Sequence, residues 1–233
     1  MEHYREDPRQ QVIKACERAL KRHDKELAER ERVNDMYELM HELGGDGVVV
    51  GVDEVGRGSV AGPLTVCAVC LPMEPRVWGI NDSKKLTPAR RELLSVKIAE
   101  VATAIGFAIS RRRISMKWAW PVLSVPPLRA RGRYGTEPDC VLMDGNPLGA
   151  VPNERDVVKG DAKIACIAAA SIMAKVTRDE MMVEYDAEYP EYHLAESKGY
   201  ASPEHIEAIR KHGLCPLHRV SFCGNFLQTE RLF

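Results

Sequence analysis

The hydrophobic positions of the first 45 residues repeat with the period of a helix. Apolar residues recur three and four positions apart in two clusters, Val12–Leu20 and Val33–Leu43, and the stretch between them is almost wholly charged. This pattern predicts a helix over residues 8–43 that is stopped by Gly44. We expect residues 1–45 to form a helical extension, either one amphipathic helix or a helical hairpin, that packs on the rest of the molecule. The alternative is a basic arm that contacts nucleic acid, but acids and bases alternate along this stretch.

The remaining chain alternates short apolar runs with helical patterns. Short apolar runs bounded by turn residues predict buried strands at 48–52, 64–71 and 140–143. Helical patterns predict helices at 88–104, 160–185 and 203–212. Strands that alternate with helices indicate a layered α/β fold, and we expect residues 46–233 to form one catalytic domain with a helical C-terminal region.

Composition limits where this protein works and what it binds. The 233 residues carry a formal net charge of -1, so any surface that binds phosphates must be local. Seven cysteines lie scattered in apolar stretches, and the one close pair, Cys67 and Cys70, is typical of small buried hydrophobes. Such thiols, a highly charged N-terminus and the lack of a membrane-length apolar run predict a cytoplasmic protein with no membrane contact.

Carboxylates follow two of the predicted strands directly. Asp53 and Glu54 end the run VVVGV, and Asp144 ends the run CVLM. We expect these acids at the same edge of the sheet, where open α/β sheets place their sites. Asp161 begins an apolar helix and could reach the same point. Taken singly, Asp161 is typical of a helix cap and Asp144 of a turn.

A cluster of carboxylates predicts a metal site. Acidic side chains that converge repel one another unless protons or cations neutralise them. Oxygen ligands without histidine or cysteine select Mg²⁺ or Mn²⁺ rather than zinc. Two such ions can activate water and stabilise the leaving oxygen when a phosphodiester is hydrolysed.

Two polar motifs near the acids are candidates for phosphate contacts. Gly56-Arg57-Gly58 offers backbone N–H groups that a ligand can approach closely. Asn81-Asp82-Ser83-Lys84-Lys85 offers hydroxyl, amide and ammonium groups. Either motif alone is more typical of an ordinary solvated loop.

Five motifs in order resemble bacterial ribonuclease HII. They are GVDEVGRGSVAGPL, NDSKKLTPARRELL, VLMDGN, VVKGDAKIACIAAASIMAKVTRD and SKGYASPEHIEAIRKHGLCPLHRVSF, which span most of residues 47–110 and 136–226. The resemblance implies a ribonuclease H-like fold with a mixed central sheet flanked by helices. It also implies an endonuclease that uses Mn²⁺ or Mg²⁺ to cleave RNA in RNA–DNA hybrids, single ribonucleotides embedded in DNA duplexes included, and leaves 5′-phosphates. Separately, we expect the protein to be a monomer.

The resemblance also implies roles for individual residues. The catalytic acids would be Asp53, Glu54, Asp144 and Asp161, and the first three of them would bind the metal. The ribonucleotide 2′-hydroxyl would be read by Gly56, Arg57, Gly58 and Tyr200, and phosphates would be held by Ser83 and Lys84 together with parts of the helix 168–175. By contrast, the spacing of the histidines is not that of metal ligands, and we expect structural or surface roles for His193, His205, His212 and His218.

Residues 111–134 depart from the pattern of that family. The segment holds two of the three tryptophans, three prolines and a burst of arginines, and it has no helical period. The run Met116–Pro121 requires codons that, read from a preceding G, restore an Asp-Glu opening followed by small and apolar residues. We interpret the segment as translated out of frame, with a divergent loop as the alternative. A damaged scaffold would leave a hybrid-binding protein with impaired catalysis, and another nuclease of the same fold, such as a junction resolvase, is the other alternative function.

Overall fold

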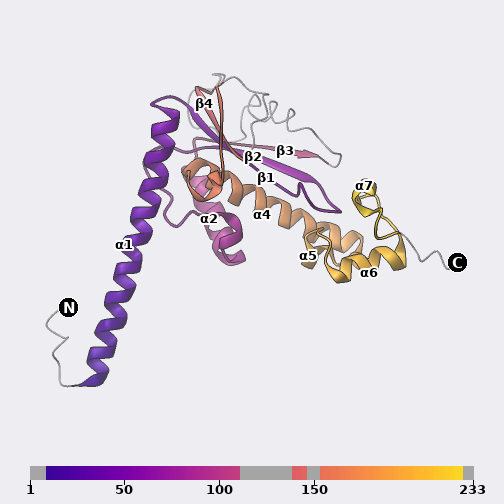
Figure 1. The fold of residues 1–233 in the computed structure, drawn as a ribbon, viewed down its shortest axis with the longest axis horizontal. Helices are drawn as coiled ribbons and strands as arrows, with labels where there is room; N and C mark the ends of the chain where they lie inside the picture. The colour runs from indigo at the N-terminus through magenta and orange to yellow at the C-terminus, as the bar shows by residue number, and fades with distance from the viewer. Residues whose placement is uncertain (1–8, 111–137, 146–152, 228–233) are drawn as a thin grey trace.

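The N-terminal extension is a single long helix. A computed structural model describes residues 9–110, 138–145 and 153–227, and α1 (Gln10–Gly44) is its first element. The helix ends where Gly45 adopts a φ of 74° and donates its N–H to the His41 carbonyl. Only the last third of α1 packs on the body, through Val33, Met36, Tyr37 and Met40, and the first part projects away from it (Figure 1). The hairpin expected as one alternative is therefore wrong.

The body is built on a mixed five-stranded sheet in the order β3-β2-β1-β4-β5. The strands are β1 (Val49–Val55), β2 (Leu64–Cys70), β3 (Ala104–Ser110), β4 (Cys140–Asp144) and β5 (Glu154–Val157). The central strand β1 pairs antiparallel with β2 and parallel with β4. This is the mixed sheet flanked by helices that the family resemblance implies.

One long helix, α4 (Ala165–Glu188), covers one face of the sheet and lies directly against β1 (Figure 1). The contact is close because a Cβ at Gly51 would lie 2.2 Å from the carbonyl carbon of Cys166. The alanine-rich first half of α4 is buried, so small residues on both elements allow this approach. The other helical elements are α2 (Pro88–Val101), α5 (Leu194–Ser197), α6 (Pro203–His212) and α7 (Val220–Cys223), with short 3₁₀ turns η2 (Ser83–Lys85), η4 (Gly160–Ala162) and η5 (Pro190–Tyr192).

Several predicted elements differ from those observed. Strand β1 continues past the predicted end at residue 52 to Val55. Asp53 and Glu54 therefore lie within the strand, near its end. Strand β3 begins where the predicted helix 88–104 was expected to end and was not itself predicted, and its alternating exposure, with Phe107 and Ile109 outward, explains why no buried run marks it. The polar strand β5 carries no apolar pattern either. The predicted helix 160–185 is in fact η4 followed by α4.

The anomalous segment 111–134 lies outside the described residues. All seven cysteines are described and are free thiols, with Cys67 buried and Cys70 half-buried. Within the described ranges, no helix has both the length and the hydropathy needed to cross a bilayer.

Candidate active site

The pairing of β1 with β4 places two acids side by side. The two strands run parallel with Val52 opposite Met143, so Asp53 and Asp144 follow at neighbouring positions on the same edge of the sheet. Asp53 is 8% exposed, and the Glu54 side chain is 14% exposed. The structure therefore brings these three predicted acids together at one end of two buried strands.

Burial and neighbouring negative charges raise the pKa of Asp53 and that of Glu54. Burial raises the pKa of Asp53 to about 7, the nearby Ser171 hydroxyl opposes that shift, and the charges of Glu54 and Asp144 add to it. Burial is also the main cause of the raised pKa of Glu54. The Arg57 guanidinium, 3.6 Å from the Glu54 carboxylate, lowers it. A cation at this point would relieve the repulsion.

Asp161 reaches the same cluster through the 3₁₀ turn η4. The Asp144 carboxylate accepts the backbone N–H of Gly160 at 2.7 Å and so ties the end of β4 to that turn. Burial raises the pKa of Asp161, and the charges of Asp144 and Asp82 raise it further, whereas Lys84 lowers it. Asp161 does not cap α4, because the capping position is Ile164, so the helix-cap interpretation is wrong.

The donor set of this cluster fits a hard divalent cation. Four carboxylates approach one sheet edge, and neither histidine nor cysteine lies among the predicted ligands, which is the chemistry that Mg²⁺ and Mn²⁺ prefer. The side chains do not form a ready-made cage: within the described residues, no three acidic, histidine or cysteine side chains gather closely enough to hold an ion. The charges of Glu54 and Asp144 reach Asp53 and raise its pKa, although the side chains do not form a complete ligand set.

Ser171 and Asp82 lie beside these acids, although the sequence named them only as members of the helix 168–175 and of the motif Asn81–Lys85. The Ser171 hydroxyl, on the buried face of α4, lies 2.9 Å from the Ser83 hydroxyl and also next to Asp53. Asp82 accepts the backbone N–H of Lys84 and adds its charge to that of Asp161. The helix 168–175 was expected to hold phosphates in part, but only the fold shows that its serine faces Asp53.

The predicted phosphate-binding pair divides into one buried and one exposed residue. Ser83 is 4% exposed and directs its hydroxyl to Ser171, whereas the Lys84 side chain is exposed beside Asp161. Arg91 in α2 fixes this turn, because its guanidinium donates to the carbonyls of Ser83 and Leu86. Lys84 is thus the cation of the pair that solvent reaches.

The Gly-Arg-Gly segment is shaped by packing at its first glycine and is open at its last. Gly56 has a φ of 88°, and a Cβ there would lie 2.3 Å from the Arg178 side chain. A Cβ at Gly58 would meet nothing within 4 Å. The Arg57 side chain is 72% exposed. The close approach of Arg178 therefore requires glycine at position 56. Arg57 and Gly58 face outward, where a ligand can approach.

Arg178 connects the segment after Gly56-Arg57-Gly58 with the segment before Tyr200, the two parts of the chain that were predicted to contact the ribonucleotide. The side chain is fully buried, and its guanidinium donates to four groups: the carbonyls of Pro63, Ala61 and Lys198 and the hydroxyl of Ser59. Three of these groups follow the Gly-Arg-Gly segment, and the fourth precedes Tyr200. The same guanidinium lies 5.6 Å from the centre of the Tyr200 ring, which is 40% exposed.

Two buried histidines support the backbone at Tyr200. The Nδ1 of His218 accepts the Cys215 N–H, so its Nε2 carries the proton and donates to the Nε2 of His205 at 3.1 Å. The Nδ1 of His205 then donates to the Tyr200 carbonyl at 2.9 Å. Burial lowers the pKa of His205 and also that of His218, the latter to about 4. Both rings are neutral and structural, as expected.

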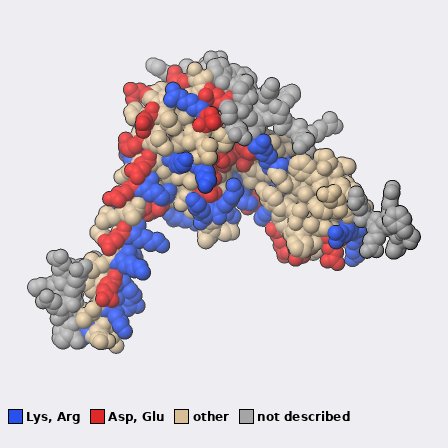
Figure 2. All heavy atoms as spheres, viewed as in Figure 1, with Lys and Arg blue, Asp and Glu red and all other residues tan. Residues whose placement is uncertain are grey.

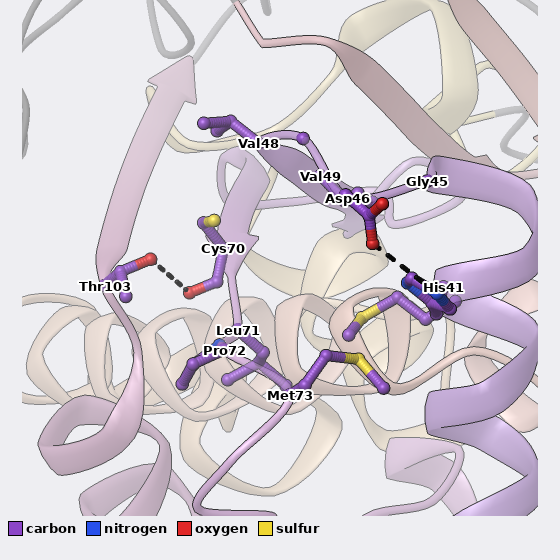
Figure 3. A pocket seen from close by; sticks show the side chains of 12 residues that line it. His41, Gly45, Asp46, Val48, Val49, Cys70, Leu71, Pro72, Met73 and Thr103 are labelled. Carbon is purple, nitrogen blue, oxygen red and sulfur yellow. Dashed lines mark hydrogen bonds and ion pairs between the residues drawn. The ribbon is translucent and has the colours of Figure 1, made fainter.

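A separate pocket lies at the opposite end of β1. It encloses about 320 Å³ between the end of α1, the start of β1 and the end of β2, and its lining includes His41, Asp46, Val49, Cys70 and Thr103 (Figure 3). The His41 ring faces Asp46 at 3.7 Å, and the Thr103 hydroxyl donates to the Cys70 carbonyl. None of the predicted site residues lines this pocket, so it is no part of the acidic site.

Comparison with known proteins places this arrangement in one family. The profile of the family described as Ribonuclease HII matches residues 50–118 and 141–225, and that of the Ribonuclease HII N-terminal domain matches residues 1–43. The chain is 42% identical over 218 residues to "Ribonuclease HII" of Ruminiclostridium cellulolyticum, covering 89% of this chain and 82% of that protein.

Solved structures agree on the fold. The ribonuclease H2 of Pyrococcus horikoshii OT3 superimposes with a TM-score of 0.60 and 25% identity, over 78% of this chain and 99% of that one. A ribonuclease HIII in complex with Mn²⁺, 18% identical with a TM-score of 0.53 over 75% of this chain and 65% of that one, shares the fold. The chain belongs to the ribonuclease HII family and is an RNA-cleaving ribonuclease H endonuclease.

Proposed function

We propose that this enzyme hydrolyses the phosphodiester at ribonucleotides in RNA–DNA hybrids and in DNA duplexes with single embedded ribonucleotides, and that Asp53, Glu54 and Asp144 hold the divalent ion. The observation that carries the proposal is the parallel register of β1 and β4, which sets Asp53 beside Asp144 at one sheet edge with Glu54 adjacent. The raised pKa of Asp53 and that of Glu54 are what a cation-binding cluster requires.

The residues around the acids have complementary roles in this proposal. Asp161 adds a fourth carboxylate, and Ser171 orients Asp53. Lys84 and Ser83 hold phosphates of the substrate strand. The Ser83 hydroxyl also contacts the Ser171 hydroxyl. Arg57 and Gly58 with the Tyr200 ring read the ribose 2′-hydroxyl, the group that separates RNA from DNA. The bound ion supplies activated water and stabilises the leaving oxygen.

The family depends on divalent metal ions, and we propose Mn²⁺ or Mg²⁺ for this enzyme. A carboxylate donor set suits both ions, and a protein of the same fold has been solved with Mn²⁺. We further propose that the enzyme acts as a monomer in the cytoplasm, with residues 1–45 as an extension and residues 46–233 as the catalytic domain. Gel filtration of the purified chain tests the monomer.

The direct test uses a DNA duplex with one ribonucleotide, incubated with Mn²⁺ or Mg²⁺. We expect a cut at the ribonucleotide that leaves a 5′-phosphate, and a loss of at least about 10³-fold in rate for Asp53→Asn, since removing one electrostatic element of a site commonly costs about 10²–10³ and Asp53 also binds the ion. Glu207→Gln, which changes an exposed acid of α6 far from the cluster in sequence, is the charge-matched control and should retain the parent rate.

Two outcomes would favour the alternative functions. A folded chain that binds the duplex with the usual salt dependence but leaves it uncut, with or without Asp53, is a hybrid-binding protein with impaired catalysis. A chain that cuts branched DNA lacking any ribonucleotide is a junction resolvase on the same fold. Either result, with the ribonucleotide duplex intact, contradicts the proposal.

A further inference from the structure

Arg57 and Tyr200 combine an outward side chain with a backbone carbonyl that the protein holds in place. The Arg57 side chain is 72% exposed, and Tyr200 is 40% exposed. The Arg57 carbonyl accepts a hydrogen bond from the Arg219 guanidinium at 3.0 Å. The Tyr200 carbonyl accepts one from the Nδ1 of His205 at 2.9 Å. Side chains of the C-terminal region thus fix both backbones, while the Arg57 and Tyr200 side chains remain accessible to a ligand.

Both hydrogen bonds lead back to one dipeptide, His218-Arg219. Arg219 bonds the Arg57 carbonyl directly. His218 reaches Tyr200 through a second ring, because its Nε2 donates to the Nε2 of His205 at 3.1 Å. Two neighbouring residues therefore control where the Arg57 and Tyr200 backbones lie relative to each other. We call His205, His218 and Arg219 the brace residues.

The dipeptide is itself fixed to the turn between β1 and β2. An isolated antiparallel bridge joins it to residues 60–62. The Arg219 N–H donates to the Val60 carbonyl at 2.8 Å, and the Gly62 N–H donates at 3.0 Å to the carbonyl of the residue before His218. The guanidinium of Arg219 also donates to the Gly62 carbonyl at 3.1 Å. As a result α7, which begins directly after the dipeptide, lies beside this turn (Figure 1).

The two histidines are packed too tightly to move separately. His205 is fully buried, and His218 is 8% exposed. The Tyr192 ring meets the His218 ring edge-on at 4.8 Å between ring centres and lies 6.2 Å from the His205 ring. The Cys215 N–H donates to the Nδ1 of His218 and so fixes its tautomer. A displacement of His218 would therefore move the His205 ring and, with it, the Tyr200 carbonyl.

Stability alone does not require this hydrogen-bonded pair of rings. Two apolar side chains of similar size would fill the same space without the cost of burying polar groups. Only a hydrogen-bonding ring at position 205 can hold the Tyr200 carbonyl in one direction. The choice of histidine at both positions therefore favours a role in positioning.

The surface of this region also favours positioning over attraction of a polyanion. Figure 2 shows that most of the surface over α5, α6 and α7 is uncharged on the face in view, and that Asp and Glu side chains gather along its lower edge. A broad phosphate-binding surface needs clustered Lys and Arg. On this face the region therefore contributes more by holding neighbouring segments than by its charge.

We propose that the brace residues are positioning residues for ribonucleotide recognition, which set the relative placement of Arg57 and Tyr200 and so decide which phosphodiester of the substrate lies at the acids. The inference rests on the proposed function, because it takes those two residues as the ones that contact the ribonucleotide. Arg178 fixes the stretches next to them, whereas the brace residues fix the carbonyls of Arg57 and Tyr200 themselves.

The first arm of the test separates position from charge at Arg219. Arg219→Lys keeps the charge, but its single ammonium cannot hold the Arg57 and Gly62 carbonyls as the planar guanidinium does. Arg155→Lys is the matched control, because the Arg155 guanidinium also donates to a backbone carbonyl, that of Leu43 at 2.7 Å, and that bond lies at the end of α1. Cleavage is measured on a DNA duplex with one ribonucleotide and on one with a short run of ribonucleotides.

We expect Arg219→Lys to lower kcat/KM by about 10–100-fold, since a displacement of about 1 Å can cost 10²-fold. The loss should lie mainly in a higher KM, because contacts to the ribonucleotide are already made in the bound substrate. On the run of ribonucleotides, the cuts should spread from the linkage that the parent prefers to its neighbours. Arg155→Lys should keep the parent KM and the parent cut positions.

The second arm compares two substitutions of His205. His205→Asn keeps an N–H donor near the position of Nδ1, and His205→Leu fills the space without one. Both remove the acceptor of the His218 ring, so they differ in the bond to Tyr200. The asparagine variant should keep cut positions close to those of the parent, and the leucine variant should spread them. In a Tyr200→Ala background this difference should disappear, because the residue through which His205 acts is gone.

Three results would overturn the inference. Parent values of KM and cut position in Arg219→Lys mean that only the charge at position 219 matters. Equal behaviour of the two His205 variants, in the presence of Tyr200, means that the bond to its carbonyl positions nothing. A lower kcat in the variants with the parent KM and cut positions reflects only a smaller folded fraction, which urea unfolding measures independently.

Failure of the proposed function looks different. In that case the parent itself leaves both duplexes uncut with Mn²⁺ and with Mg²⁺, and the inference falls with it. If the parent cuts and the variants cut at the same linkages with the same KM, the proposed function stands and only the inference is wrong.

Discussion

At the scale of single residues, Asp53 makes the stability of the fold depend on pH. The pKa of this carboxyl is about 7 in the folded chain and about 4 when exposed. Between these values the folded state keeps a proton that the unfolded state has lost, so the Asp53 contribution is complete below about pH 4 and is lost as pH rises through 7. His218, with its lowered pKa, acts in the opposite direction over part of this range.

The Asp53 effect is isolated by difference. Asp53→Asn removes the titration and leaves the histidines, so we expect it to be more stable than the parent at pH 8, by up to about 4 kcal/mol for a shift of about three pKa values, and to lose this advantage toward pH 4. Urea unfolding at each pH measures it. Added Mn²⁺ should stabilise the parent more than the variant at pH 8. Equal pH profiles for the two proteins would contradict the assignment.

Thr65 carries an unpaired hydroxyl in the core. In the described residues its Oγ1 is the buried side-chain oxygen without a hydrogen-bond partner, and the residue is fully buried in β2. Such a group costs about 1–3 kcal/mol, so Thr65→Val should raise the melting temperature by about 2–4 °C for each kcal/mol recovered. Thr103→Val is the control, because its hydroxyl donates to Cys70 and its loss should not stabilise the protein.

At the scale of elements, the contact between β1 and α4 controls the site. Gly51→Ala places a methyl group 2.2 Å from the Cys166 carbonyl carbon and 2.4 Å from the Ile167 nitrogen, and backbone cannot rotate away. We expect a loss of about 3 kcal/mol or more in urea unfolding. Cleavage should fall too, because α4 carries Ser171 and Arg178. Gly224→Ala, where a Cβ meets nothing within 4 Å, should unfold like the parent.

The elements that could be predicted from sequence are those with local signals. Helices α2 and α6 begin with Thr87-Pro88 and Ser202-Pro203, whose hydroxyls cap them, and both starts were predicted. Within the described part of the chain, the edge strands β3 and β5 are paired on one side only and have no continuous apolar run, so pattern alone missed them. Their presence follows from pairing with β2 and β4, which is tertiary information.

The candidate site divides in the same way. Asp53, Glu54 and Asp144 could be placed together because they follow buried runs, and parallel strands end at one edge. Ser171 and Arg178 could not, since a serine or an arginine within a helix is ordinary, and only the packing of α4 shows where each points. Acids at the ends of strands can be recognised in a sequence, whereas the side chains that pack against those acids cannot.

At the scale of the whole molecule, the family match is interrupted where the sequence departs from its pattern. The match to the ribonuclease HII family stops at residue 118 and resumes at 141, which overlaps most of residues 111–134. We therefore predict that resequencing the gene will show a displaced reading frame across this segment. The in-frame protein should be the more stable one in urea, because restored buried side chains each contribute about 2–5 kcal/mol. If the reading frame is intact at both ends of residues 111–134, the prediction is wrong and the segment is a divergent loop.

Arg178 makes the two segments that we propose to contact the ribonucleotide a single cooperative unit. Its guanidinium bonds to residues 59–63 and to Lys198, and the N–H groups of Val60 and Ala61 both donate to the Gly199 carbonyl. Neither segment can leave its place without stranding a buried charge, so neither should open alone. In native-state hydrogen exchange, the amides of Val60 and Ala61 should therefore share one opening free energy, and the recognition of RNA would be gained or lost as a whole.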